Sequence, residues 1–138
     1  PAAFDTLWTF FEQTGTAPAD YDLIVTGDLG QVGRDLLLQL MREQRMPLDE
    51  RLHRDCGLMI YDRERQDAHA GGSGCGCSAS VLCASLLPAL QQGDLKRIIF
   101  MATGALMSQT TFLQKESIPA ISHLVELAAP EEQNGGNT

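Results

Sequence analysis

Two short apolar segments without alternating polar residues constrain the fold of this chain most strongly. They are DLIVT (residues 22–26) and RIIFMA (residues 97–102). Strands that are apolar on both faces have to be covered on both faces, as happens in parallel sheets flanked by helices. These segments therefore predict a layered α/β domain with a mostly parallel sheet.

Apolar residues at spacings of three and four predict helices around these strands. The first expected helix contains Phe4 to Phe11 and ends at Thr14-Gly15. The second spans residues 32–45, with these apolar positions: Val32, Leu36, Leu37, Leu40 and Met41. A third runs through residues 81–90 to Gly93, and Pro88 is expected to bend or shorten it.

Two further segments are candidate strands, at residues 57–61 and 118–127, while the charged residues 62–66 are typical of a solvated loop. No helical crossover separates the strands at 97–102 and 118–127, so we expect them to pair antiparallel. The expected domain covers residues 1–128, and the acidic, Gly- and Asn-containing segment 129–138 is expected to be a flexible tail.

Charge and hydropathy exclude two classes of protein. The chain has 18 acidic and 10 basic residues, a net charge of -8, and its basic residues form no cluster longer than two, so a nucleic-acid partner is not expected. Its apolar segments are shorter than the roughly 20 residues that cross a bilayer. Because it begins at Pro1 without Met, we expect a piece of a longer protein.

The cysteine pattern favours free thiols. Three of the four cysteines, Cys75, Cys77 and Cys83, lie within nine residues of one another, and Cys56 is the fourth. The disulfide frameworks of small secreted domains are more widely spread. We therefore expect reduced thiols in a cytosol-like compartment.

Four segments together resemble a known family: YDLIVTGDLGQVG, RDCGLMIYD, DAHAGGSGCGCSASV and IIFMATGALMS. They are similar to the C-terminal half of the stage V sporulation protein AD family, a branch of the thiolase-like superfamily, over about residues 1–128. The resemblance implies two similar α/β halves in five layers, of which this chain supplies most of the second, with a buried helix of small residues. It also implies that the first strand of this half is missing.

The resemblance further implies a function and partners. The family is expected to be noncatalytic and to bind dipicolinic acid, as such or as its calcium chelate, for uptake into and release from bacterial spores. Expected partners are the spore membrane channel subunits of the same operon type, at the spore (forespore) inner membrane, where the protein would be peripheral. We also expect a homodimer or packing against the missing N-terminal half, so that the isolated piece either self-associates or is part of a longer chain.

Catalysis can be tested at two positions that the resemblance identifies. Enzymes of this fold use a nucleophilic cysteine from the first half, together with one His and one His or Asn from the second. Those two positions correspond here to Asp28 and to residues 73–75, and neither holds His or Asn. A carboxylate at Asp28 would oppose a developing oxyanion. A noncatalytic protein is thus expected, with an acyl-CoA condensing enzyme or thiolase, or a purely structural dimerisation half, as alternatives.

The glycine-rich segment 67–77 has three interpretations. Its glycines could allow close backbone approach, while small residues thin the following helix. Alternatively, Gly74, Cys75 and Gly76 could form one wall of a dicarboxylate site, because a helix start presents unpaired N–H groups. Zinc is a third possibility through His69, Cys75 and Cys77, but the spacing is unusual and a fourth ligand is missing. No resident metal or cofactor is expected.

Three other residues complete the candidate ligand site. Asp28 could face a bound dicarboxylate through a calcium ion, or it could cap the helix near Val32 or order the turn at 27–30. His69 could tune anion affinity with pH, or could only pack or face solvent. Thr103 lies at another edge of the same cleft by resemblance, or belongs to a turn of small residues.

Overall fold

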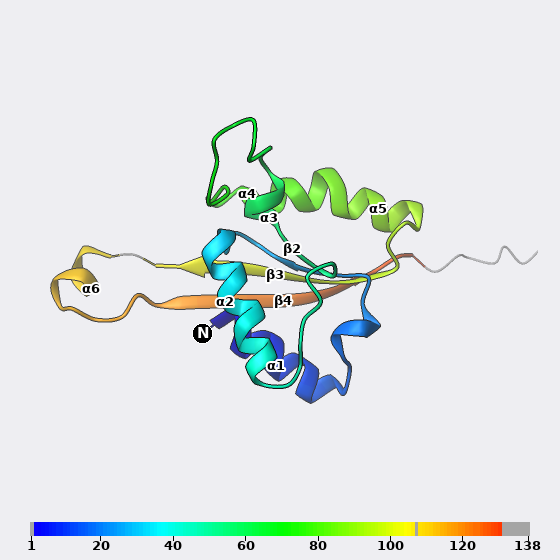
Figure 1. The fold of residues 1–138 in the computed structure, drawn as a ribbon, viewed down its shortest axis with the longest axis horizontal. Helices are drawn as coiled ribbons and strands as arrows, with labels where there is room; N and C mark the ends of the chain where they lie inside the picture. Colours follow the sequence, from blue (N-terminus) through cyan, green and yellow to red (C-terminus); the bar gives the residue numbers. More distant parts are fainter. Residues whose placement is uncertain (1, 107, 131–138) are drawn as a thin grey trace, which may run out of the picture.

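A computed structural model describes residues 2–106 and 108–130 and shows a four-stranded mixed sheet (Figure 1). Its order is β2-β1-β3-β4. The central strand β1 pairs in parallel with β2 and β3, and β4 runs antiparallel to β3. The strand bounds are Leu23–Thr26 for β1, His53–Asp55 for β2, Arg97–Ala105 for β3 and Ala120–Ala128 for β4. The mostly parallel α/β sheet with an antiparallel end strand is therefore confirmed.

Helices cover both faces of this sheet (Figure 1). The helices α1, Ala2–Thr14, and α2, Gly30–Glu43, lie on one face. The opposite face carries a continuous helical segment whose parts are α4, Cys77–Val81, the π turn η2, Leu82–Leu86, and α5, Leu87–Gln92. Three short elements remain: η1, Pro18–Asp20, α3, Cys56–Met59, and α6, Gln109–Leu113. All three long helices predicted by apolar spacing are confirmed, with shifted bounds.

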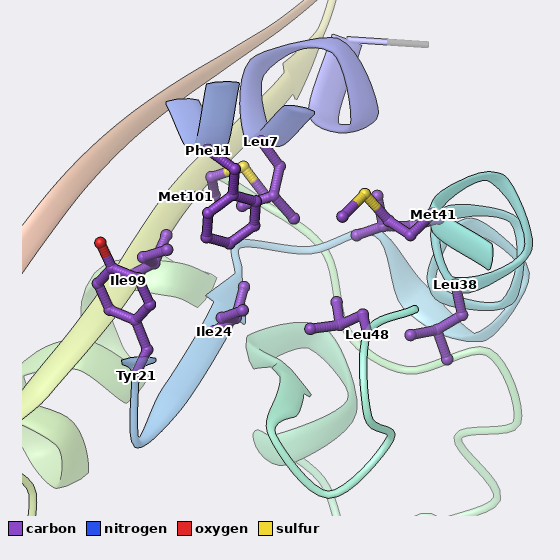
Figure 2. Close-up of a cluster of buried hydrophobic side chains, with 10 residues drawn as sticks. Leu7, Phe11, Tyr21, Ile24, Leu38, Met41, Leu48, Ile99 and Met101 are labelled. Carbon is purple, nitrogen blue, oxygen red and sulfur yellow. The ribbon is translucent and has the colours of Figure 1, made fainter. Parts of the chain in front are cut away.

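The first core lies between α1, α2 and the sheet (Figure 2). Side chains from both helices converge on β1 and β3, and Leu48 closes the cluster from the loop that follows α2. Its buried members are Leu7, Phe11, Tyr21, Ile24, Leu37, Leu38, Met41, Leu48, Ile99 and Met101. Ile99 and Met101 point to this core while Ile98 and Phe100 point to the other, which explains the lack of polar alternation in β3.

The second core lies under the helical segment 77–92, which contacts the sheet with Cys77, Val81, Leu86 and Leu90. Pro88 lacks a backbone N–H, and the π turn ends at Leu86, two residues before it, so the helix continues through Gln92 with a changed hydrogen-bond ladder. Gly93 ends it with a φ of 79°. The opposite side of this segment is exposed and small: Ala79, Ser80, Cys83, Ala84 and Ser85.

The predicted strand at residues 57–61 is wrong. Residues 56–59 form the short helix α3, and the strand that pairs with β1 is the polar segment His53–Asp55 just before it. The apolar run at 57–61 favours a strand locally, but Gly57 is held by the glycine-rich loop, because the Gly72 amide donates to its carbonyl over 2.6 Å. Tertiary contact therefore overrides strand propensity here.

Two smaller expectations also require correction. Residues 103–105 form no turn of small residues: they continue β3 and pair with residues 120–122 of β4. In α2, Val32 and Leu36 do not belong to the buried face, since they are 78% and 44% exposed. The helix is rotated so that Leu38 is buried instead.

The order of the strands brings distant segments together. Thr26 of β1 is the register partner of Met101 of β3, with no other strand between them.

The strand expected before α1 stays a prediction. Part of the expected flexible tail, residues 131–138, lies outside the described residues. Within the described chain, no helix combines the length and hydropathy needed to cross a membrane.

Candidate functional site

A groove of about 730 Å³ opens at the carboxyl ends of β1 and β3. This is the edge at which parallel α/β sheets usually bind ligands. Its polar end contains Asp28, Ser73, Gly74, Cys75 and Thr103. The rest of its wall is mainly apolar, with these larger side chains: Phe4, Leu29, Leu36, Leu37, Leu40 and Ile121. The groove thus joins one polar end to an apolar trough.

Asp28 connects three segments at the polar end. One carboxylate oxygen, Oδ1, accepts from the Thr103 hydroxyl over 2.9 Å, and the Asp28 amide donates back to the same hydroxyl oxygen over 3.1 Å. The other oxygen, Oδ2, accepts from the Ser73 hydroxyl at 2.7 Å and the Gly74 amide at 3.3 Å. Asp28 therefore holds the glycine-rich loop against the end of β3.

The glycines in this loop serve different purposes. A Cβ at Gly71, where φ is 92°, would lie 2.6 Å from the Gly57 carbonyl oxygen, and one at Gly72 would lie 2.7 Å from Ile60 and Tyr61 side-chain atoms. These two positions require close packing, as the structural interpretation expects. Gly74 has a φ of 135° but open space around it. Glycine is therefore favoured at this groove position by its backbone conformation and not by close packing.

A buried polar network lies next to the groove, and sequence reasoning missed it. Asp55 is 1% exposed, and its carboxylate accepts from the Thr26 hydroxyl at 2.6 Å and from the amides of Leu29 at 2.9 Å and Gly30 at 3.1 Å. His53 Nε2 lies 3.2 Å from the Thr26 hydroxyl. His53 and Asp55 are buried and Arg54 is exposed, but three polar residues in the segment HRD give no sequence signal that could have identified this strand.

His53 in this network is held neutral by its surroundings. Burial, helped by the nearby charges of Arg34 and Arg54, lowers the pKa of the imidazole to about 4. Since the Thr26 hydroxyl donates to Asp55, it accepts from Nε2–H of His53. Nδ1 then carries no proton, and it is buried without a hydrogen-bond partner within the described structure.

The structure brings together four of the six predicted site residues. Asp28, Gly74, Cys75 and Thr103 all line the groove. His69 lies outside it, 88% exposed, with Nε2 2.8 Å from the Asp67 carboxylate.

Gly76 precedes α4 and is also absent from the groove wall. A role for His69 or Gly76 in the site stays a prediction. The alternative that Asp28 caps α2 is wrong, because Asp55 accepts from the amides at the start of that helix.

The four cysteines are all free. Cys56 and Cys77 are buried, whereas Cys75 and Cys83 are exposed. Burial, together with the Asp55 carboxylate, raises the pKa of the Cys56 thiol to about 12. Burial also raises the pKa of Cys77, with smaller contributions from Asp28 and Asp55. Residues 2–106 and 108–130 contain no group of three His, Cys, Asp or Glu side chains suited to hold a metal ion.

The groove offers a limited set of chemical groups. Among the described residues that line it, Asp28 is the only one with a charged side chain, and none of them carries an imidazole or a carboxamide. Hydroxyls of Ser73 and Thr103 and the exposed thiol of Cys75 supply the remaining polar side-chain atoms. Such a set can bind oxygen-rich or cationic groups, but it lacks the usual proton shuttle of acyl-transfer sites.

Fold and groove together define an α/β protein with a groove at the carboxyl edge of a mostly parallel sheet, consistent with part of a thiolase-like fold. A family model described as stage V sporulation protein AD matches residues 1–128. The chain is also 45% identical, over 123 residues, to the stage V sporulation protein AD of Bacillus subtilis (strain 168). The chain belongs to the stage V sporulation protein AD family, and the family supports a role in sporulation.

The match covers the two proteins unequally. It includes 89% of this chain but only 36% of the Bacillus subtilis protein. The chain therefore spans about a third of the length of the curated relative that it matches.

Proposed function

We propose that this chain forms the ligand-binding part of a noncatalytic spore protein that binds dipicolinic acid, for its uptake into spores and its release from them. The polar end of the groove carries this proposal, because Asp28, Thr103 and Ser73 gather oxygen atoms next to an apolar wall. An apolar wall suits the aromatic ring of the ligand, and a few placed polar groups fix its orientation. Membership in a sporulation family supports this assignment.

The charge of Asp28 favours the calcium chelate over the free acid. Dipicolinate has two carboxylates, and an anionic side chain inside the groove repels them when nothing lies between. Calcium binds carboxylate and other oxygen ligands, so it can join Asp28 to the ligand. The hydroxyls of Ser73 and Thr103 are the neighbouring oxygens that could complete the contact.

Residue chemistry supports a noncatalytic role. A carboxylate at position 28 and Ser, Gly and Cys at positions 73–75 offer no imidazole to accept a proton and no carboxamide to stabilise an oxyanion. The apolar trough, however, would also suit an acyl chain. An acyl-CoA condensing enzyme or thiolase is therefore the second candidate. An assay for turnover of acetyl-CoA or acetoacetyl-CoA tests it.

The same proposal includes a location and partners. We place the protein peripherally on the forespore inner membrane, in contact with the channel subunits of the same operon type, and as a homodimer or packed against an N-terminal half. Large apolar side chains on the exposed surface support a contact with other protein. They include Leu106, Phe112, Leu113, Ile118, Ile121 and Val125.

Calorimetric titration of the complete protein with dipicolinate tests the proposal. We expect binding in calcium that becomes at least about tenfold weaker in EGTA, and Asp28→Asn to abolish most of this calcium dependence. Asp94→Asn is the matched control, because the exposed Asp94 lies outside the groove and its loss should leave the affinity unchanged.

Two outcomes would refute parts of the proposal. Equal binding with and without calcium would show that Asp28 does not face the ligand through a cation. Turnover of acetyl-CoA or acetoacetyl-CoA by the complete protein would support the enzyme instead. The predicted role of His69 is tested separately: His69→Ala should weaken binding more at pH 6 than at pH 8, and an unchanged affinity at both values would dismiss that role.

A further inference from the structure

The buried carboxylate of Asp55 lies behind the groove and does not line it. Both of its oxygens are engaged by the segment that leaves β1: Oδ2 accepts from the Thr26 hydroxyl and the Leu29 amide, and Oδ1 accepts from the Gly30 amide. Hydrogen bonds to an ionised acceptor are stronger than those between neutral groups. Asp55 therefore fixes the chain on both sides of Asp28.

The orientation of Asp28 depends on the backbone conformation that Asp55 holds. Asp28 lies directly before the two residues whose amides donate to Asp55, and Gly30, with a φ of 66°, turns the chain into α2. Its own carboxylate then reaches Thr103 on one side and Ser73 on the other. The buried Asp55 carboxylate thus holds the backbone around Asp28, and the half-buried Asp28 carboxylate holds Thr103 and Ser73 at the groove.

We propose that Asp55 is a positioning residue for the candidate ligand site, because it sets the path of residues 28–30 and thereby holds Asp28 against Thr103 and Ser73. This inference rests on the proposed function for its binding readout. The Thr26 hydroxyl takes part, since it donates to Asp55 over 2.6 Å and links it to His53. Loss of Asp55 is expected to loosen the polar end of the groove without touching the ligand.

The chain offers a matched control at the opposite end of β1. Asp22 accepts from the amides of Lys96 at 2.7 Å and Arg97 at 3.0 Å, so it also holds two backbone N–H groups with one carboxylate. It precedes β1, whereas the groove lies at the carboxyl end of that strand. A general loss of sheet stability should follow from either substitution, but a change in the groove should follow only from Asp55.

The experiment compares Asp55→Asn and Asp22→Asn in the complete protein, by amide hydrogen exchange and by titration with calcium dipicolinate. Asparagine keeps the shape but directs an NH₂ group toward amide donors that need an acceptor. For Asp55→Asn we expect at least about tenfold faster exchange in residues 28–31 and 73–75, and about tenfold weaker binding. For Asp22→Asn we expect faster exchange near residues 96–97 and an affinity within about twofold of wild type.

Several results would overturn the proposal. Equal losses of affinity in the two variants, in step with their loss of thermal stability, would reduce Asp55 to a structural role. Unchanged exchange at residues 73–75 in Asp55→Asn would show that the effect does not reach the loop. If Asp55→Asn does not fold, Thr26→Val leaves the Asp55 carboxylate in place and removes the hydroxyl that contacts Asp55 and His53. It must shift exchange and affinity in the same direction, with Thr26→Ser restoring both.

The two proposals fail separately. Absence of dipicolinate binding by the wild-type protein would refute the proposed function. The exchange pattern at residues 28–31 and 73–75 would still decide whether Asp55 positions the polar end of the groove.

Discussion

Asp28 and Thr103 are joined by two hydrogen bonds, although 75 positions separate them in the sequence. The Thr103 hydroxyl accepts from the Asp28 amide and donates to the Asp28 carboxylate. One side chain at the end of β3 therefore satisfies both the backbone and the carboxylate of a residue beyond the end of β1. This pair closes one side of the polar end of the groove.

Replacing Thr103 with valine is expected to open this contact. Valine keeps the shape but lacks the hydroxyl, so the Asp28 amide and carboxylate each lose a partner. We expect thermal unfolding to show a loss of about 1–2 kcal/mol, and titration to show weaker binding of calcium dipicolinate. Thr103→Ser retains the hydroxyl and should stay close to wild type. Equal behaviour of the valine and serine variants would contradict this role.

The stability of the protein should depend on His53 in acid. Its folded pKa of about 4 lies below the ordinary 6.5, so between these values the unfolded chain binds more protons. Stability should therefore fall as the pH falls from 6.5 to 4, by about 3 kcal/mol at about 1.4 kcal/mol per pKa unit. His53→Gln keeps an N–H donor for Thr26 but cannot titrate.

Denaturant unfolding from pH 7 to pH 4 measures this difference. Carboxylates titrate in the same range in both proteins, so the change in stability between wild type and His53→Gln isolates the histidine. The difference should shrink or reverse as the pH falls. A constant difference across this range would show that His53 is not neutral and buried in the folded protein.

Two glycines near the groove should differ in how much stability an alanine substitution costs. Gly71→Ala introduces a Cβ that meets the Gly57 carbonyl in a backbone conformation with φ of 92°, so we expect a loss of more than about 2 kcal/mol. Gly76 has a φ of -97° and open space around it, so Gly76→Ala should change stability by less than about 1 kcal/mol. Thermal unfolding of both variants provides the comparison.

The cysteines should differ in reactivity. Cys75 is exposed at the groove, whereas Cys56 is fully buried and its thiol has a pKa of about 12. Iodoacetamide under native conditions should therefore modify Cys75 and spare Cys56. Mass spectrometry of the digested protein measures both, and protection of Cys75 by calcium dipicolinate would place the ligand in the groove. Early modification of Cys56 would contradict its burial.

Local sequence patterns predicted the parts of the fold that depend on apolar burial. The segments at 22–26 and 97–102 are strands, and the three long helices follow the spacing of their apolar residues. The antiparallel final strand followed from the missing crossover. The strands and helices were predictable because each depends mainly on the residues within the element, and the antiparallel pairing because it depends only on the connection between two neighbouring strands.

The site was only partly predictable, because its organising contacts join distant segments. Asp28, Gly74, Cys75 and Thr103 were identified through family resemblance, and they line one groove. Asp55 was missed, since a carboxylate in the sequence HRD gives no sign that it will be buried against the amides of Leu29 and Gly30. Its strand was misplaced for the same reason, because buried polar residues lack the pattern of a hydrophobic strand.

The direct pairing of β1 with β3 has a consequence for biosynthesis. Residue 26 finds its register partner only at residue 101, so one flank of β1 remains without its neighbour until about three quarters of this sequence has left the ribosome. Long-range parallel pairing of this kind is intrinsically slow. A nascent chain that stalls before β3 would present β1 with one unpaired edge, which is the stage at which chaperones should bind it.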